Sequence, residues 1–302
     1  MYRGGDMKRK SLLQTIGDTP MIELNNTLSG NGTYLFAKLE GRNPGGSIKD
    51  RAALYMIEQA EARGELDKSR TIIEATSGNM GIALTIIGTC KGYRVQIVMS
   101  EQMSRERRIM MRALGAELIL TDKELGTEGA IQRAREIVAN APDEYWFADQ
   151  FNNPDNATAH YFGIADEILK DVRTIDAIVI GVGTGGTIMG LARRFREKSP
   201  GTRVVGVIPD KGYHIQGLQH PTEDFCGDIY DPAMIDELIC VPADDAFETT
   251  RRFAATEGLF VGMSSGAALY AARRVHRSMR HGSVVVILPD GGEKYLTTNL
   301  FG

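Results

Sequence analysis

The sequence has 302 residues, of which 42% are hydrophobic and 25% are charged, as in an ordinary globular protein with room for two lobes and their cores. Its 39 acidic and 35 basic residues give a net charge of −4, which argues against nucleic acid or an anionic membrane surface as the main partner. No apolar run approaches the roughly 18 residues that a membrane-spanning helix needs, so we expect no membrane association.

Three widely spaced cysteines, Cys90, Cys226 and Cys240, fit neither a disulfide framework nor a CxxC metal site. We therefore expect a reduced, cytoplasmic protein without a bound metal. The polar start at residues 1–10 has no signal-peptide core, and Met7 is an alternative initiation codon to Met1.

Short β-branched runs alternate with longer helical patterns along nearly the whole chain. The predicted strands are Tyr34–Glu40, Thr71–Ala75, Arg94–Met99, Glu117–Thr121, Tyr145–Asp149, Asp176–Val182, Arg203–Ile208, Leu238–Val241 and Ser283–Leu288. The predicted helices are Ala52–Ala62, Ile82–Cys90, Arg105–Leu114, Glu128–Asn140, Ala159–Lys170, Ile188–Lys198, Ala246–Glu257 and Ala267–Met279. Continuously apolar strands separated by helices indicate an α/β protein with parallel sheets covered on both faces. The polar stretch from Asn152 to Asn156 is the predicted lobe boundary, with the active cleft at the carboxyl ends of the strands.

The turn Asn43-Pro44-Gly45-Gly46-Ser47-Ile48-Lys49-Asp50-Arg51 leads directly into the first long helix. Ser47 followed by Asp50 has the form of a capping box, so we expect Ser47 to cap the helix and Lys49 to lie in its first turn. A cation is unfavourable at that positive helix end, and burial also favours a neutral, nucleophilic amine. On spacing alone, a solvated lysine is the commoner interpretation.

Three loops of small residues each run from an apolar segment into a helix. They are Ala75-Thr76-Ser77-Gly78-Asn79-Met80-Gly81, Gly181-Val182-Gly183-Thr184-Gly185-Gly186-Thr187 and Val261-Gly262-Met263-Ser264-Ser265-Gly266. Such loops present free N–H groups to an anion. Together with Lys49 they predict a ligand that carries a phosphate and a carboxylate.

The second loop has a rival interpretation. Gly181, Gly183 and Gly186 match the dinucleotide fingerprint, and Asp210 ends the next strand, as in an NAD-binding oxidoreductase. That hypothesis gives no role to Lys49 or to the Thr-Ser-Gly-Asn loop, so we rank it below the phosphate site.

The Lys49 turn, Thr76-Ser77-Gly78-Asn79 and Gly183-Thr184-Gly185-Gly186-Thr187 resemble the pyridoxal-phosphate-dependent cysteine synthases, the O-acetylserine sulfhydrylases. Their B-type isozyme is the one most similar to Asp149-Gln150-Phe151-Asn152-Asn153-Pro154-Asp155-Asn156 and Ala159-His160-Tyr161. The resemblance runs from Gly17-Asp18-Thr19-Pro20 to Tyr295-Leu296-Thr297. It implies the tryptophan-synthase-β-like fold (fold type II), with two open twisted sheets covered by helices and an active site between two domains. It also implies a mobile smaller domain of residues 1–18 and 42–152, a larger domain of residues 19–41 and 153–302, and a homodimer.

The resemblance assigns roles residue by residue. Lys49 would hold pyridoxal 5'-phosphate as a Schiff base and act as the catalytic base, and Asn79 would bind the ring hydroxyl. Gly183, Thr184, Gly185, Gly186 and Thr187 would bind the phosphate, and Ser264 would meet the ring nitrogen. The substrate carboxylate would lie against Thr76, Ser77, Asn79, Met80 and Gln150. The implied reaction is β-replacement, which converts O-acetylserine and sulfide to L-cysteine and acetate through an α-aminoacrylate.

Several positions leave alternatives open. Met80 stands where the sulfhydrylases commonly have threonine, and a thioether cannot donate a hydrogen bond. The loss of that contact admits a non-catalytic binding protein, unless backbone N–H groups suffice. Gln219 stands where phosphoserine-using relatives have arginine, with Lys211 and His214 near it in sequence as further donor-selecting residues. Ile164-Ala165-Asp166-Glu167-Ile168 is more like cystathionine β-synthase, so a related enzyme that uses serine and homocysteine, O-phosphoserine or thiosulfate is the alternative.

Overall fold

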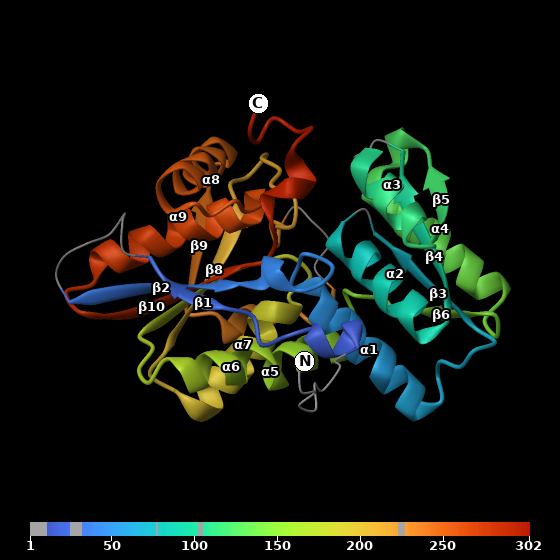
Figure 1. Ribbon diagram of the computed structural model, residues 1–302, viewed down its shortest axis with the longest axis horizontal. Coiled ribbons are helices and arrows are strands. Elements are labelled where there is room, and N and C mark those ends of the chain that lie inside the picture. The colour runs from blue at the N-terminus through green and yellow to red at the C-terminus, as the bar shows by residue number, and fades with distance from the viewer. Residues whose placement is uncertain (1–10, 25–31, 77, 102–104, 223–226) are drawn as a thin grey trace, which may run out of the picture.

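The computed structural model describes residues 11–24, 32–76, 78–101, 105–222 and 227–302. Its strands form one sheet of six and one of four, and helices cover both sheets (Figure 1). The two sheets form separate layers, one on each side of the region where the glycine-rich loops lie. Ser77, Cys226 and the first ten residues lie outside the described part of the chain.

The larger sheet has the strand order β1-β2-β10-β7-β8-β9 and is parallel except for β1, which pairs antiparallel with β2. Its strands are β1 (Met21–Glu23), β2 (Thr33–Leu39), β7 (Ala177–Gly181), β8 (Arg203–Pro209), β9 (Glu237–Val241) and β10 (Gly282–Leu288). The smaller sheet is parallel, in the order β5-β4-β3-β6. Its strands are β3 (Thr71–Ala75), β4 (Arg94–Ser100), β5 (Glu117–Thr121) and β6 (Tyr145–Phe147).

Nine helices of the α type surround these sheets within the described residues. They are α1 (Lys49–Arg63), α2 (Asn79–Lys91), α3 (Arg105–Ala113), α4 (Gly126–Asn140), α5 (Asp155–Phe162), α6 (Ile164–Asp171), α7 (Gly186–Lys198), α8 (Ala243–Glu257) and α9 (Met263–Ser278). Short 3-10 helices cover Leu12–Thr15, Glu40–Arg42, Lys123–Leu125, Pro232–Met234 and Gly292–Tyr295.

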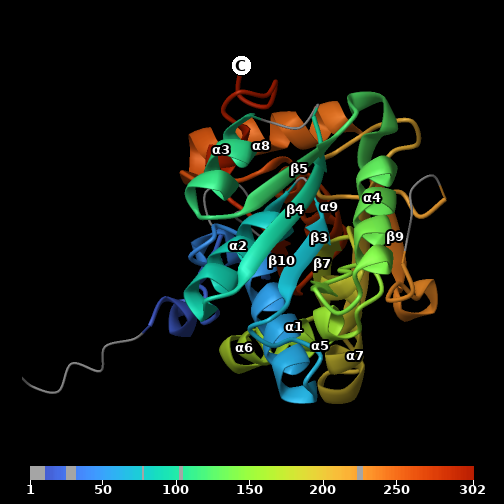
Figure 2. The same cartoon turned by 90° about the vertical axis from the view of Figure 1, so that its right-hand side faces the viewer.

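Successive side chains of a strand point to opposite faces of the sheet, so β10 contributes to two hydrophobic cores. In β10, Val284 and Val286 pack with α8 and α9, whereas Val285 and Ile287 face α5 to α7 on the opposite side. Burying each such aliphatic side chain contributes about 1.5–3 kcal/mol. Figure 2 shows the smaller sheet in the same sandwich arrangement, with α2 on one face and α4 on the other.

The structure contains a strand at each of the nine predicted positions, and β1 is an additional one. The single helix predicted over residues 159–170 is wrong, because the chain breaks there into α5 and α6 at Gly163. The backbone at Gly163 has φ −99° and ψ −96°, outside the helical region, and a Cβ there would lie 2.7 Å from the carbonyl oxygen of Ala159. The polar stretch at residues 152–156 connects β6 of the smaller sheet to α5 beside the larger one.

Candidate active site

Lys49 is the first residue of α1 and lines a cavity of about 780 Å³ between the two sheets. The predicted capping box is wrong. The helix begins after Ile48, and the carboxylate of Asp50 reaches back to accept a 2.5 Å hydrogen bond from the N–H of Gly45. The N–H of Lys49 donates to Ser47 Oγ at 3.3 Å, so Ser47 still supports the start of the helix.

The amine of Lys49 lies deep in the protein, although part of the side chain faces the cavity. Its Nζ is 3.4 Å from Thr184 Oγ1. Removal from bulk solvent lowers the pKa of Lys49 to about 8, while the charge of Glu74 acts in the opposite direction. A larger fraction of this amine than of an ordinary lysine is therefore neutral and nucleophilic near neutral pH.

Glu74, near the end of β3, is a buried acid that the sequence interpretation missed. Its carboxylate accepts hydrogen bonds from the N–H groups of Ala75 at 3.0 Å and Gln150 at 3.2 Å. Burial raises the pKa of Glu74 to about 8, and the charge of Asp149 adds to this rise. The available signal was an acid inside the otherwise apolar strand Thr71-Ile72-Ile73-Glu74-Ala75.

The loop from Gly183 to Thr187 forms the N-terminus of α7 and requires its glycines. A Cβ at Gly186 would lie 2.2 Å from Asn156 Oδ1, and a Cβ at Gly183 would lie 2.6 Å from the carbonyl oxygen of Gly217. Gly185 adopts the left-handed φ of 86°. Because the first N–H groups of a helix have no intrahelical partner, this tight turn presents donors to an anion such as phosphate.

Side chains from α5 support this loop from behind. Asn156 donates to Thr184 Oγ1 at 3.1 Å and to the carbonyl oxygen of Gln150 at 2.7 Å. His160 Nε2 lies 3.3 Å from Thr187 Oγ1. Burial holds the pKa of His160 well below its usual range, and the cations of Lys49 and Arg51 act in the same direction, so the imidazole is neutral. The sequence interpretation assigned no role to either residue.

Ser264 is the second residue of α9 and is buried beside the same loop. A second, smaller cavity of about 70 Å³ is lined by Ser264, Lys49, Asn79, Thr184 and Thr187 among others. The structure therefore brings together the start of α1, the loop before α7 and the start of α9, which are far apart in the sequence.

The predicted substrate loop lies at the end of β3 and the start of α2. Thr76, Asn79 and Met80 line the larger cavity together with Gln150, which follows β6. Met80 is 1% exposed and belongs to the apolar core beside the smaller sheet. Its thioether therefore supports the loop through packing, and the N–H groups at the start of α2 are the donors available to a carboxylate.

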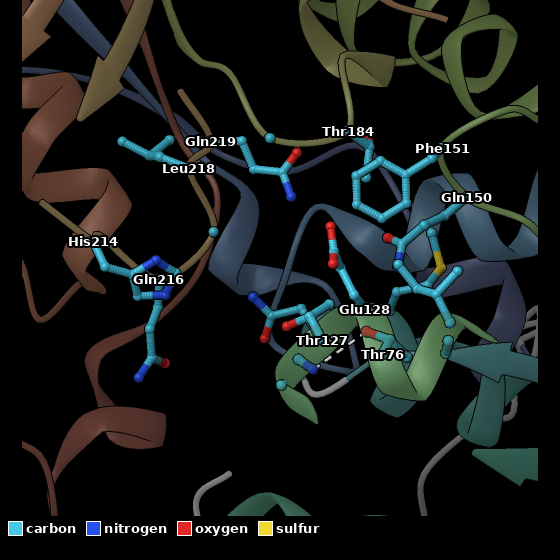
Figure 3. A pocket seen from close by; sticks show the side chains of 18 of the residues that line it. Thr76, Thr127, Glu128, Gln150, Phe151, Thr184, His214, Gln216, Leu218 and Gln219 are labelled. Atoms are coloured by element: carbon cyan, nitrogen blue, oxygen red, sulfur yellow. Dashed lines mark hydrogen bonds between the residues drawn. The ribbon is translucent and has the colours of Figure 1, made fainter. Parts of the chain in front are cut away.

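The donor-selecting prediction concerned three residues in the segment after β8, of which two line the cavity. Gln219 and His214 do so, whereas Lys211 is exposed and is not among the lining residues of the described chain. The Oε1 atom of Gln219 is buried, and among the described residues it has no hydrogen-bond partner. Figure 3 shows Gln219 pointing into the cavity from one wall and Glu128 of α4, which the sequence interpretation missed, from another.

The described residues contain no cluster of three His, Cys, Asp or Glu side chains that could hold a metal ion. Nor do they include a helix with the length and apolar character that crossing a membrane demands.

The residues present fit a ligand that has an aldehyde, an anionic group and a polar ring. The amine at Lys49 can attach to an aldehyde, and the loop before α7 is shaped for a phosphate. Ser264 and Asn79 provide polar atoms on the remaining sides of the smaller cavity. Pyridoxal phosphate is a ligand that has all three of these features.

Comparison with known proteins agrees with this geometry. The family model described as "Pyridoxal-phosphate dependent enzyme" matches residues 12–290. Cysteine synthase B of Salmonella typhimurium is 44% identical over 293 residues, which cover 97% of this chain and 96% of that protein. The crystal structure of cysteine synthase from Entamoeba histolytica has a TM-score of 0.92 at 38% identity, with 100% of this chain and 94% of that chain covered. The O-acetylserine-dependent cystathionine β-synthase of Helicobacter pylori has a TM-score of 0.91 at 33% identity, with 98% of this chain and 100% of that chain covered.

Proposed function

The chain belongs to the pyridoxal-phosphate-dependent enzymes, and on that premise we propose that it is a cysteine synthase that converts O-acetylserine and sulfide to L-cysteine and acetate. The observation that carries this proposal is the meeting of Lys49, Thr184 and Ser264 at one cavity. Curated cysteine synthases that are 39–44% identical over nearly the full length support it. Membership of this family also favours a pyridoxal phosphate site over the dinucleotide site at residues 181–186.

We assign the cofactor contacts to four parts of the site, which His160 supports. The amine of Lys49 attaches the aldehyde carbon, and residues 183–187 hold the phosphate through their N–H groups and threonine hydroxyls. Ser264 meets the ring nitrogen, and Asn79 binds the ring hydroxyl. His160 holds the hydroxyl of Thr187 from behind, as a neutral ring that adds no further charge to the phosphate site.

When bound, pyridoxal phosphate withdraws electrons from the α-carbon of an amino acid, which makes loss of the α-proton and of a β-substituent feasible. The amine of Lys49, which the amino group of the substrate would displace from the cofactor, removes that proton as general base and later returns it from the same nitrogen. Its lowered pKa of about 8 suits both directions of transfer. Thr76, Ser77, Gln150 and the N-terminus of α2 bind the substrate carboxylate, and Met80 contributes through its backbone N–H.

We further propose a mobile smaller domain of residues 1–18 and 42–152 beside a larger domain of residues 19–41 and 153–302. Strands β3 to β6 fall in the first set, and the six strands of the other sheet fall in the second. Substrate lies between the two sheets, so movement of the smaller domain onto a bound carboxylate excludes water from the reaction.

We assign O-acetylserine as the donor from the side chains that the segment after β8 places at the cavity wall. Gln219 offers a neutral amide and His214 lies at the exposed rim, whereas O-phosphoserine calls for a bidentate cation. Lys211 does not line the cavity and so does not supply that charge.

A bulkier sulfur nucleophile is the second candidate. Thiosulfate and homocysteine are the alternative acceptors to sulfide. The Helicobacter pylori neighbour named as a cystathionine β-synthase is a precedent for a thiol amino acid on this fold.

The test is to supply O-acetylserine, O-phosphoserine and serine separately, each with sulfide, thiosulfate or homocysteine, and to identify the amino acid formed. We expect cysteine from O-acetylserine and sulfide. Formation of cystathionine from serine and homocysteine alone would replace this proposal with the cystathionine β-synthase alternative.

Two properties of the whole protein complete the proposal. We place the protein in the cytoplasm, where the thiols of Cys90 and Cys240, both free and exposed, stay reduced. We also propose a homodimer that acts on small molecules without nucleic acid or membrane partners.

A further inference from the structure

The side-chain amide of Asn79 is held at both ends by residues that follow β10. Its Nδ2 donates to Asp290 Oδ2 at 2.8 Å, and its Oδ1 accepts from Lys294 Nζ at 2.9 Å. Asp290 is 1% exposed and Lys294 is 5% exposed, so water does not substitute for either contact. Asn79 is thus fixed by two oppositely charged groups inside the protein.

This arrangement determines which way the amide faces. An ammonium group can only donate, and an ionised carboxylate can only accept. Rotating the amide by half a turn would set its N–H group against Lys294 and its oxygen against Asp290. Both hydrogen bonds would be lost in a buried setting, which would leave two charged groups without these partners.

Lys294 has a further part in the site. Its remaining two donors reach the carbonyl oxygens of Gly45 at 2.8 Å and Gly46 at 3.1 Å, in the turn that precedes Lys49. The hydroxyl of Tyr295 donates to the same Asp290 oxygen at 2.7 Å. Asp290 and Lys294 therefore connect the end of the larger sheet to the start of α2 and to the turn that precedes Lys49.

One hydrogen of the Asn79 amide remains available. Among the contacts of the described residues, Nδ2 makes a single hydrogen bond, to Asp290, and Asn79 lines both cavities. Since an amide nitrogen carries two hydrogens, the second can serve a ligand.

We propose that Asp290 and Lys294 are positioning residues that fix the amide orientation of Asn79 and so reserve its second N–H for the hydroxyl of the cofactor ring. This inference rests on the proposed cofactor contact of Asn79. It adds two residues, more than 200 positions from Asn79 in the sequence, that act on the cofactor through another side chain.

The test is the affinity of cofactor-free protein for pyridoxal phosphate, measured by absorbance titration in a double-mutant cycle. Lys294→Met should weaken binding about tenfold in the presence of Asn79, as expected for a misoriented hydrogen bond. In an Asn79→Ala background the same change should alter the affinity by less than about twofold, because no amide remains to be oriented. Lys170→Met, on the exposed face of α6, removes a lysine charge elsewhere and should leave the affinity unchanged.

A tenfold loss in both backgrounds would mean that Lys294 acts only through the turn at Gly45 and Gly46, and would overturn the inference. Unchanged affinity in both backgrounds would also overturn it. Lys294→Gln retains N–H donors and should keep most of the affinity, which provides a second variant where Lys294→Met does not fold. If the unmodified protein fails to bind pyridoxal phosphate, the proposed function itself falls and this inference with it.

Discussion

Nζ of Lys49 and Oγ1 of Thr184 lie 3.4 Å apart, although 135 positions separate the two residues in the sequence. The contact places a buried amine directly beside the loop that presents N–H groups at the start of α7. Thr184 also accepts a hydrogen bond from Asn156, which fixes its hydroxyl relative to α5. An aldehyde-reactive group and an anion site therefore meet at one point.

The first prediction concerns the shape of the phosphate loop. Gly186→Ala should destabilise the protein by about 1–3 kcal/mol and weaken cofactor binding, because the added methyl group overlaps Asn156 Oδ1 at 2.2 Å. Urea unfolding and cofactor titration measure the two effects. Gly201→Ala is the matched control, since a Cβ there has no atom within 4 Å and should be nearly neutral. Equal stability of the two variants would contradict this account of the loop.

The second prediction concerns the attachment of α1. Arg51, two residues after Lys49, pairs with Glu40 at 2.6 Å and with Glu167 at 2.6 Å, and its side chain is 5% exposed. Arg51→Met should lower the free energy of unfolding by about 3–5 kcal/mol, because it leaves the fully buried carboxylate of Glu40 without its cationic partner.

A control for this effect lies on the same helix. Arg63 has a side chain that is 43% exposed and pairs with Glu65 at 2.7 Å and with Asp155 at 2.8 Å, and Arg63→Met should cost less than about 1 kcal/mol. Comparable losses in the two variants would show that burial of the Arg51 pair does not determine its contribution.

The third prediction concerns the pH dependence of stability. In the folded protein the pKa of Glu74 is about 8, whereas in the unfolded chain this pKa is close to the ordinary value of 4.5. The folded state therefore binds more protons between these values, and this group makes the protein less stable as pH rises from about 4.5 to about 8.

Glu74→Gln should remove that contribution. The difference in unfolding free energy, variant minus parent, should become more positive with rising pH across this window when measured by urea unfolding at several pH values. If this difference in unfolding free energy stays constant from pH 5 to pH 8 within experimental error, Glu74 titrates at its ordinary pKa and the prediction is wrong.

The fourth prediction concerns the choice of donor. Gln219→Arg places a fork of N–H donors at the cavity wall and should raise kcat/KM for O-phosphoserine relative to O-acetylserine by roughly tenfold or more. Gln132→Arg adds the same charge on the exposed side of α4 and should leave this ratio unchanged. A ratio that moves equally in both variants would trace the change to net charge rather than to the site.

Local patterns in the sequence placed Lys49, the loop at residues 183–187 and Ser264 at turns that lead into helices, because glycine, proline and small polar residues mark such turns. Their cofactor roles came from the resemblance to a family, since on spacing alone a solvated lysine was the commoner interpretation of Lys49. The same local logic failed at Gly163, where contact with the carbonyl oxygen of Ala159 interrupts a helical pattern.

The supporting residues could not be predicted because their partners are distant in the sequence. Asp290 meets Asn79 across 211 positions, and Lys294 meets Gly45 across 249. Met80 was a doubtful substrate contact from its residue type alone, and its burial in the core of the smaller sheet changes its role to packing. Such contacts follow from the packing of two lobes and not from the pattern of either one.

Borohydride reduction is the sharpest test of whether Lys49 carries the cofactor. Reduction of the purified protein followed by peptide mass spectrometry should place a single phosphopyridoxyl group on Lys49, and Lys49→Ala should lose the label. A label on another lysine, or a protein that binds pyridoxal phosphate without covalent attachment, would contradict the account.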